Sequence, residues 1–386
     1  MKDIRLGIIG LGNMGSTHAR NLLQGAVPGM VLSALCDKNA DRLKPFPEVA
    51  HFSDANALIT SPTVDAVLVA TPHFDHTVYG IATLQAGKHL LVEKPISVHK
   101  QDCEKLIAAY TDKRLVFAAM FNQRTDPRYA KLKALIDSGE LGQLRRATWN
   151  VTGWFRTESY YASGGWRATW KGEGGGVLLN QSPHQLDLWQ HFFGMPTKVR
   201  AFVTLARYHD IEVEDDVTAY LENADGFRGV FITTTGEAPG SDRLEIAAER
   251  GRVVLDAEVD DIRWIRNETP MSAWSKTCPG GFTRPPRWEV IVPTGTDKDP
   301  QHVGIMRNFA AAIREGTPLT APGVEGIRSV ELANAMLYSG LKDETVELPL
   351  DSGRYAQFLD GLIAHSREKP HVARETSSPD DFSQSF

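Results

Sequence analysis

Short apolar runs alternate with amphipathic segments over roughly the first 120 residues of the chain. The apolar runs suit buried strands, and the segments between them carry apolar residues at helical spacing. Such alternation predicts a parallel sheet that is covered by helices on both faces. The expected strands are residues 4–10, 30–37, 64–71, 89–95 and 115–122, and the expected helices are residues 14–25, 76–87 and 97–113.

The pattern changes after about residue 123, where β-branched and aromatic residues alternate with polar ones. Strands of this kind tolerate one exposed face, so they predict a largely antiparallel sheet. Two of the segments contain the hairpin signals ADG and ERG. The expected strands lie within 144–155, 197–208, 215–235 and 242–257, and the expected helices are 127–139, 302–315 and 324–340. Residues 366–386 are polar with few aliphatic side chains, which predicts a flexible tail.

Composition limits the kinds of partner and compartment. The 386 residues are 42% hydrophobic and 23% charged, which is typical of a globular protein with a core of its own. The net charge of −6 argues against nucleic acid and anionic membranes as partners. No apolar run reaches the roughly 20 residues that a membrane span needs. Cys36, Cys103 and Cys278 form neither a zinc spacing nor a disulfide framework, and the N-terminus lacks a signal peptide's long apolar region, so we expect a cytoplasmic protein.

A glycine-rich turn joins the first expected strand to the first expected helix. Gly10, Gly12 and Gly15 fit the pattern GxGxxG, in which the glycines permit a tight turn and close approach of the backbone to a pyrophosphate at the helix N-terminus. Asp37 ends the second strand, where a carboxylate accepts hydrogen bonds from ribose hydroxyls and repels a 2′-phosphate. The pattern predicts a doubly wound Rossmann domain that prefers NAD to NADP, and the alternative is a glycine turn without a ligand.

Two further motifs end expected strands. Residues 70–72 read Ala-Thr-Pro and residues 93–95 read Glu-Lys-Pro, and ligands of doubly wound sheets bind beyond the carboxyl ends of the strands. Lys94 is therefore expected beside the nicotinamide, although most lysines are solvated surface residues. His73 and His76 follow the first motif without an accompanying carboxylate cluster, so we expect cofactor-cleft or helix-start roles for them and no metal.

Together with the stretch 174–187, GGGVLLNQSPHQLD, these motifs resemble those of the Gfo/Idh/MocA family of NAD(P)-dependent oxidoreductases, which act on sugars, cyclitols and related compounds. The resemblance covers about residues 1–350 and includes the segment 121–124 and Glu214-Asp-Asp216. It implies an α/β protein with a Rossmann domain over residues 1–122 and a C-terminal α/β domain over residues 123–365. That second domain would have a large, mostly antiparallel open sheet, which implies a homodimer or homotetramer.

The resemblance also implies catalytic roles. The family usually has Lys, Asp and His as a catalytic trio, and Lys94 and His184 match the first and the last. Asn180 stands where the family commonly has Asp. Because an amide cannot ionise, a proton relay through residue 180 is in doubt, while hydrogen bonds from Asn180 to substrate hydroxyls or to the histidine stay open.

His184 lies just after a Ser-Pro step in the stretch 173–187. Ser182, Pro183 and Gln185 have the pattern of a capping box, which would put His184 in the first helical turn, where the positive end of the helix dipole disfavours an imidazolium. The alternative is a longer helix from about residue 176 that is kinked at the proline. A neutral histidine is what a general base requires near neutral pH, whereas a histidine taken alone would be a helix-start residue satisfied by its neighbours. Asp187 would orient the ring or tie the helix down.

Half of the eight tryptophans fall within residues 149–171, among arginines and tyrosines. Sugar rings pack on flat aromatic side chains, and arginine grips hydroxyls or anionic groups. We expect Trp149 in the core, and Trp166, Arg167 and Trp170 in a substrate pocket. The cations of this segment hint at an acidic sugar.

These interpretations give three groups of site residues. The expected catalytic residues are Lys94, His184 and Asn180. The expected cofactor-binding residues are Gly10, Gly12, Asn13, Met14, Gly15, Asp37, Thr71, Pro72, His76, Glu93, Lys94 and Asn122. The expected substrate-binding residues are Lys94, Arg124, Trp166, Arg167, Trp170, Asn180 and His184.

Three functions are compatible with these residues. The favoured one is an NAD-dependent dehydrogenase that transfers a hydride between a secondary alcohol of a sugar, sugar derivative or cyclitol and the nicotinamide. The alternative is a glycosidase that retains its NAD and acts by transient oxidation, elimination, hydration and re-reduction of a glycoside. A non-enzymatic nucleotide-binding sensor is the third.

Overall fold

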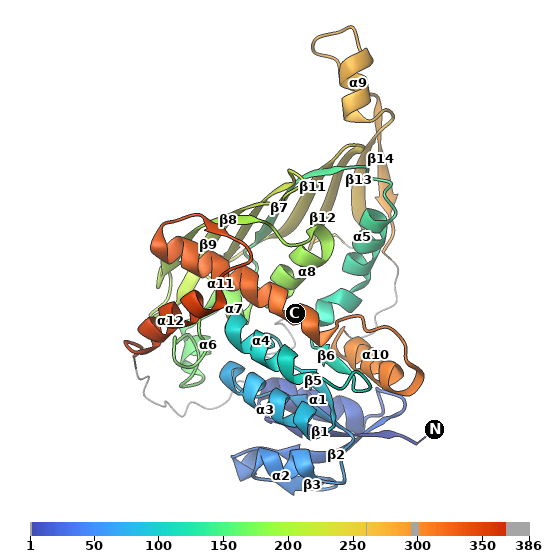
Figure 1. The fold of residues 1–386 in the computed structure, drawn as a ribbon. Helices are drawn as coiled ribbons and strands as arrows, with labels where there is room; N and C mark the ends of the chain where they lie inside the picture. Colours follow the sequence, from blue (N-terminus) through green and yellow to red (C-terminus); the bar gives the residue numbers. More distant parts are fainter. Residues whose placement is uncertain (1, 260, 295–300, 368–386) are drawn as a thin grey trace.

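The computed structural model describes residues 2–259, 261–294 and 301–367 and builds them around two β-sheets (Figure 1). The expected tail 366–386 lies outside the described residues from position 368 onward. No helix in the described part of the chain is both long and apolar enough to cross a membrane.

The first sheet is parallel and has six strands in the order β3-β2-β1-β4-β5-β6. Its strands other than β3 are largely buried on both faces, which explains why their sequences read as continuous apolar runs. The strands are β1 Ile4–Ile9, β2 Met30–Cys36, β3 Ala50–Phe52, β4 Ala66–Val69, β5 His89–Val92 and β6 Phe117–Ala119, and the helices between them are α1 Asn13–Leu23, α2 Ala55–Thr60, α3 His73–Gln85 and α4 Lys100–Ala109.

Two of these elements, β3 and α2, were not expected from the sequence. β3 has only three residues at the sheet edge, with Ala50 and His51 exposed, so it carries no apolar run. α2 has six residues, and its start is marked by Asp54, whose carboxylate accepts a hydrogen bond from the Ala57 N–H at 2.7 Å. Elements this short give too few positions for a periodic pattern.

The second sheet has nine strands in the order β14-β13-β12-β11-β7-β10-β9-β8-β15, and it is antiparallel except where β10 pairs with β7. The two predicted hairpins are β9–β10 and β11–β12. The strands are β7 Leu144–Val151, β8 Lys198–Leu205, β9 Glu214–Glu222, β10 Arg228–Thr234, β11 Asp242–Ala248, β12 Gly251–Asp256, β13 Ile262–Asn267, β14 Arg287–Val292 and β15 Val346–Glu347.

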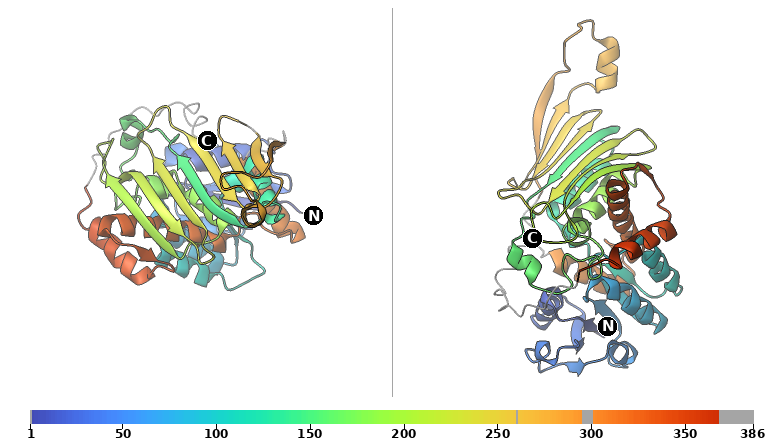
Figure 2. Two further views of the ribbon diagram at one scale, coloured as in Figure 1. Left: turned by 90° about the horizontal axis from the view of Figure 1, so that it is seen from above. Right: turned by 90° about the vertical axis from the view of Figure 1, so that its left-hand side faces the viewer.

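Helices cover one face of the second sheet and separate it from the first (Figure 1). The helices beyond β6 are α5 Pro127–Asp137, α6 Glu158–Ala162, α7 Val177–Asn180, α8 Pro183–Phe193, α9 Met271–Thr277, α10 Gln301–Glu315, α11 Gly326–Lys342 and α12 Ser352–Ile363. α8 lies close to the sheet because Gly229 of β10 has no side chain, and a Cβ there would overlap the Trp189 ring. α9 projects beyond the end of the sheet (Figure 2).

The C-terminal part of the chain returns to the first sheet. Val303, Met306 and Phe309 of α10 belong to the apolar core of the first sheet, and the Ala119 N–H at the end of β6 donates to the Ala321 carbonyl at 3.0 Å. A division at residues 122 and 123 therefore separates the strands of the two sheets but not all of their packing.

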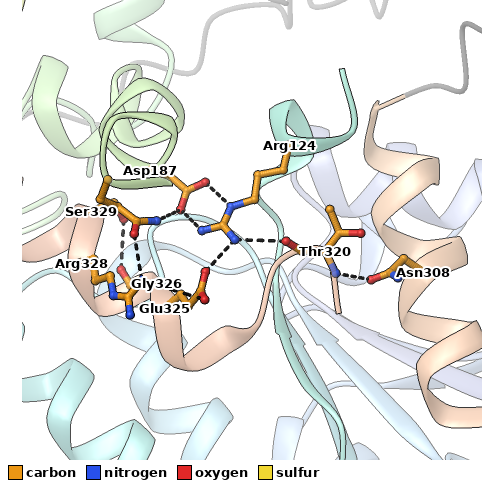
Figure 3. Close-up of polar contacts among 9 residues, drawn as sticks. Arg124, Asp187, Asn308, Thr320, Glu325, Gly326, Arg328 and Ser329 are labelled. Atoms are coloured by element: carbon orange, nitrogen blue, oxygen red, sulfur yellow. Dashed lines mark hydrogen bonds and ion pairs between the residues drawn. The ribbon is translucent and has the colours of Figure 1, made fainter. Parts of the chain in front are cut away.

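A buried ion-pair network joins α8 to this returning segment (Figure 3). The Arg124 guanidinium donates to both carboxylate oxygens of Asp187 at 2.7 Å, to Glu325 at 2.7 Å and to the Thr320 carbonyl at 3.1 Å. The side chains of Arg124 and Asp187 are only 2% and 1% exposed. Because these acceptors occupy the guanidinium, we assign Arg124 a structural role in place of the substrate contact expected from the sequence. Of the two roles left open for Asp187, the contacts support tying the helix down.

Breaking this network should destabilise the protein strongly. Arg124→Met leaves the Asp187 carboxylate buried without its partner, which we expect to cost about 3–5 kcal/mol of unfolding free energy. Arg114→Met, which removes a guanidinium on a side chain that is 91% exposed, should leave stability unchanged. Urea unfolding followed by tryptophan fluorescence measures both, and an Arg124→Met protein as stable as its parent would show that the network is dispensable.

Candidate active site

The glycine turn between β1 and α1 is open where a phosphate would lie. Gly10 has a φ of +92°, and a Cβ there would sit 2.6 Å from the Ala70 carbonyl oxygen. A Cβ on Gly15 would overlap the Gly10 carbonyl, whereas one on Gly12 would meet nothing within 4 Å. No side chain caps α1 at Gly12, so the first N–H groups of the helix, from Asn13 and Met14, face this open space. The turn therefore fits a pyrophosphate at a helix N-terminus.

Asp37 lies beside this turn at the end of β2. Its carboxylate accepts hydrogen bonds from the Leu11 N–H at 2.7 Å and the Asn39 N–H at 2.8 Å. The Arg42 guanidinium lies 3.4 Å from the same carboxylate and is half exposed. Each carboxylate oxygen has further lone pairs, so the residue fits the ribose hydroxyls of NAD.

His76 joins the two motifs at the ends of β4 and β5. Its Nδ1 lies 2.7 Å from the Pro95 carbonyl oxygen and its Nε2 lies 2.7 Å from the Thr71 carbonyl oxygen. Burial lowers the pKa of His76. The ring thus holds the two loops together, and Thr71 keeps a buried hydroxyl oxygen without a partner among the described residues. Pro72 is exposed and precedes the first turn of α3.

Glu93 binds a histidine of α1. Its carboxylate lies 2.7 Å from His18 Nε2 and also accepts a hydrogen bond from the Lys94 N–H at 3.2 Å. Burial alone would raise the pKa of Glu93, but the hydrogen bond and charge of His18 bring it down to about 2. The carboxylate is therefore ionised, and its contacts within the chain give Glu93 a positioning role for the Lys94 loop beside the cofactor site.

Lys94 reaches from the first sheet to the segment before α8. Its Nζ donates a hydrogen bond to the Asn180 backbone carbonyl at 2.7 Å. Burial lowers the pKa of Lys94 to about 8, against the opposing charges of Glu93 and Glu173. The Lys94 ammonium group thus donates a hydrogen bond to Asn180, which lies four residues before His184 in the sequence.

His184 is buried, with 3% of its surface exposed, in the first turn of α8. Burial, Lys94 and His302 lower the pKa of His184 well below its ordinary value, so its imidazole is neutral. Its Nδ1 has no hydrogen-bond partner in the described part of the chain. A neutral ring with a free nitrogen beside an ammonium group fits a general base.

The start of α8 differs from the expected capping box. Ser182 is the N-cap residue and Pro183 the first helical residue, but the Ser182 hydroxyl bonds to the Thr233 hydroxyl at 2.8 Å. Gln185 Nε2 donates to Gln123 Oε1 at 3.1 Å. The Ser182 and Gln185 side chains therefore bind other segments of the chain and do not cap α8. The predicted N-cap and first helical residue are nevertheless correct, and in place of one kinked helix the structure has two, α7 and α8, separated by Gln181 and Ser182.

Asn180 is held by two residues that the sequence did not single out. Its amide nitrogen donates to the Glu173 carboxylate, and its amide oxygen accepts a hydrogen bond from the Tyr160 hydroxyl at 3.3 Å. Glu173 is 1% exposed, also accepts the Ala168 N–H at 2.6 Å, and has its pKa raised by burial. The only local signal for Glu173 was its place seven residues before Asn180 in the glycine-led stretch.

The tryptophans of residues 149–171 divide between the core and the site. The Trp166 ring lies 5.5 Å from the His73 ring, edge to face, so it borders the loop after β4. Trp170 is 5% exposed and packs in the core of the second sheet, which favours a structural role over the expected substrate contact. Trp149 is fully buried in the same core, as the sequence predicted.

Helix α10 packs against the first sheet and adds contacts near the site that no local sequence pattern predicts. The His302 ring lies 5.6 Å from the His18 ring, and burial lowers the pKa of His302 to about 4. Gln301 accepts a hydrogen bond from the buried Asn122 amide at 2.5 Å. Asn122 was expected to bind the cofactor, and its amide oxygen has no partner among the described residues.

Comparison with known proteins agrees with this arrangement. Residues 4–121 match the model of the oxidoreductase family with an NAD-binding Rossmann fold, and residues 129–254 match the GFO/IDH/MocA C-terminal domain, so the two matches together span more than half of the chain. The chain is 25% identical over 364 residues to scyllo-inositol 2-dehydrogenase (NADP(+)) IolW of Bacillus subtilis, covering 89% of this chain and 96% of that protein. It is 28% identical over 265 residues to myo-inositol 2-dehydrogenase of Thermotoga maritima, covering 66% and 75%.

Solved structures share the fold. The WlbA dehydrogenase of Bordetella pertussis, in complex with NADH and UDP-GlcNAcA, superposes with a TM-score of 0.75 at 24% identity over 91% of this chain and 100% of that one. Levoglucosan dehydrogenase with NADH and L-sorbose gives a TM-score of 0.75 at 22% identity with the same coverage. With both family models matched and the glycine turn, Asp37 and Lys94 at the ends of the parallel strands, the chain belongs to the Gfo/Idh/MocA family of NAD(P)-dependent oxidoreductases and has an NAD-binding Rossmann domain.

Proposed function

We propose that this protein transfers a hydride between a secondary alcohol of a sugar, sugar derivative or cyclitol and the nicotinamide of NAD. The observation that carries the proposal is the hydrogen bond from Lys94 Nζ to the Asn180 carbonyl at 2.7 Å. It brings an ammonium group from the end of β5 to the segment that leads into His184. The inositol dehydrogenases among the relatives support the class of substrate.

His184 and Lys94 have different roles at the alcohol oxygen of the substrate. NAD, when bound, accepts the hydride from the carbinol carbon. The neutral His184 ring takes the hydroxyl proton, because its lowered pKa leaves a nitrogen lone pair available at neutral pH. Lys94 donates a hydrogen bond to the same oxygen and stabilises the negative charge that develops there.

Asn180 positions the substrate and does not carry a proton. Its amide nitrogen binds Glu173 and its backbone carbonyl binds Lys94, so its side chain and main chain connect the two groups. Glu173 supplies a carboxylate that accepts a hydrogen bond from the Asn180 amide. We assign it a positioning role for Asn180 and Lys94.

Substitution of the base or the ammonium group should abolish most turnover. In an assay of NADH absorbance with sugars, sugar acids and inositols, we expect His184→Ala to lower kcat by about 10²–10⁴-fold. Lys94→Ala should lower it by about 10²–10³-fold. His191→Ala on the same helix and the exposed Lys131→Ala are the matched controls and should keep full activity. NADH fluorescence titration checks that the variants still bind the cofactor.

The same panel separates the competing functions. Net NADH formation from free sugars or inositols supports the dehydrogenase. Release of the aglycone from aryl glycosides without net NADH would favour the NAD-retaining glycosidase. No turnover of either kind, together with unchanged function in the His184 and Lys94 variants, would favour a sensor.

The pH dependence of kcat/KM should report Lys94. Burial lowers the pKa of Lys94 to about 8, so the positive charge is present below that pH and is lost as the pH rises through it. Activity should therefore fall on the alkaline side of about pH 8, while the lowered pKa of His184 leaves the profile flat just below neutrality. In Lys94→Arg the charge persists, so the alkaline fall should move to higher pH. A fall at the same pH in both proteins would assign it to another group.

We also propose that the protein is a homodimer or homotetramer that assembles through the open face of the second sheet. The left view of Figure 2 shows the strands of this sheet in front of its helices. Phe202 and Tyr220 alternate with buried residues along β8 and β9 and are 65% and 40% exposed, so they lie on the face that the helices leave open. Light scattering should give a mass above 42.6 kDa, and Phe202→Glu with Tyr220→Glu should lower it toward that value. A monomeric parent protein at micromolar concentration would contradict this assembly.

A further inference from the structure

Two arginine side chains share one tyrosine ring at the edge of the site. The Arg167 guanidinium lies 4.6 Å and the Arg156 guanidinium 5.2 Å from the centre of the Tyr160 ring. Arg167 also donates a hydrogen bond to the Tyr160 hydroxyl at 2.8 Å. The same hydroxyl donates to the side chain of Asn180, whose backbone carbonyl binds Lys94. Both guanidinium groups are therefore tied to the catalytic lysine through Tyr160 and Asn180.

Neither guanidinium has a carboxylate partner in the part of the chain that the structure describes. Within residues 2–259, 261–294 and 301–367, no Asp or Glu oxygen forms an ion pair with Arg156 or Arg167. In this part of the chain, the Arg156 guanidinium donates only to the Phe155 carbonyl at 3.0 Å, and its Nε is buried without a partner. Arg124, by contrast, binds two carboxylates. Arg156 and Arg167 are thus half-buried without a carboxylate at ion-pair distance among the described residues.

Charges of both signs surround Lys94: burial lowers its pKa, while Glu93 and Glu173 raise it. Arg167 and Arg156 both act to lower the pKa of Lys94. The Glu173 carboxylate also belongs to this network, and its oxygens accept hydrogen bonds from Asn180 and the Ala168 N–H. Arg156 and Arg167 thus add positive charge to the surroundings of Lys94, and this charge attracts an anionic ligand.

We propose that Arg156 and Arg167 bind the anionic group of an acidic carbohydrate, so that the substrate is a sugar that carries a carboxylate or a phosphate. This proposal rests on the proposed function, because it names the substrate class of the same site. Guanidinium groups bind both kinds of anion through paired N–H donors. Trp154 and Trp166 support the two guanidinium groups at 5.6 Å and 4.8 Å and offer aromatic faces for the sugar ring.

The competing explanation is that these arginines only pack on the aromatic rings. Cation–π stacking and burial of the aliphatic stems stabilise a segment without any ligand. This explanation predicts no difference between neutral and acidic sugars. The two explanations are therefore separated by binding and not by stability.

Calorimetric titration of the NADH-bound protein tests the proposal. The probes are matched pairs: D-glucuronate against D-glucose, D-galacturonate against D-galactose, and glucose 6-phosphate against both glucose and glucuronate. We expect at least one acid to bind about tenfold or more tightly than its neutral partner, as one to two charge-assisted hydrogen bonds would give. A higher affinity for glucuronate than for glucose 6-phosphate would identify the anion as a carboxylate, and the reverse order would identify a phosphate.

The variants R156Q and R167Q should remove most of this preference, while R167K, which keeps the charge, should retain part of it. R114Q removes a guanidinium on a side chain that is 91% exposed and should change nothing. Unchanged NADH affinity shows that each variant is folded. Three outcomes would overturn the proposal. The acid and the neutral sugar could bind equally in every pair, or no acid could show saturable binding at millimolar concentration. The preference for acids could also survive in R156Q and R167Q.

Different results would overturn the anionic substrate class and the proposed hydride transfer. Reduction of NAD by neutral sugars or inositols without any preference for acids would overturn the anionic substrate class and leave hydride transfer in place. The opposite result is that an acid binds beside NADH but neither it nor any other alcohol of the panel is oxidised. This result would overturn the proposed function and leave the anion site in place.

Discussion

The buried ion pair between Arg124 and Asp187 is the contact on which the arrangement of the site depends. Arg124 follows β6 of the first sheet, and Asp187 lies one helical turn after His184 on α8. Because the two side chains are almost fully buried, the pair is held in one geometry and is little screened by solvent. Glu325 and Thr320 add the segment before α11 to the same guanidinium. The first sheet, α8 and the returning chain are thereby fixed relative to one another.

Given that arrangement, burial sets the protonation states that the chemistry requires. His184 is kept neutral because the low-dielectric surroundings and the neighbouring Lys94 disfavour a second positive charge. Lys94 loses part of its basicity to the same burial, but Glu93 and Glu173 keep its pKa at about 8. Glu93 in turn stays ionised beside His18. The neutral His184 ring is thus close enough to the Lys94 ammonium group to feel its charge, and the ionised Glu93 carboxylate accepts a hydrogen bond from the Lys94 N–H.

The exchange of a common aspartate for Asn180 changes how the site is held together. An amide can donate to one neighbour and accept from another at the same time, and Asn180 does so between Glu173 and Tyr160. The Glu173 carboxylate accepts the amide N–H, and the hydroxyl of Tyr160 connects the amide to Arg167. The family commonly has a charged aspartate at this position. In this protein, Asn180 connects Lys94 to Tyr160 and Arg167 at the edge of the site.

The sequence alone determined those features whose physical cause is local. Buried parallel strands read as apolar runs, the turn at Gly10 and Gly15 needs residues without a Cβ, and hairpins between exposed strands show their own turn residues. The fold class, the NAD-binding motif and the stretch around His184 were predictable on these grounds. Elements as short as β3 and α2 were missed because three to six residues cannot establish a period.

Only the tertiary structure decided which groups meet. Arg124 and Asp187 are 63 residues apart in sequence, and His302 approaches His18 because α10 returns to the first sheet. Trp170 packs in the core and Arg167 lies at the edge of the site although they are near neighbours in the chain, since their side chains leave the backbone toward different surroundings. Residue type limits what a side chain can do, but its partners, its burial and hence its charge follow from contacts between distant segments, which no local pattern records.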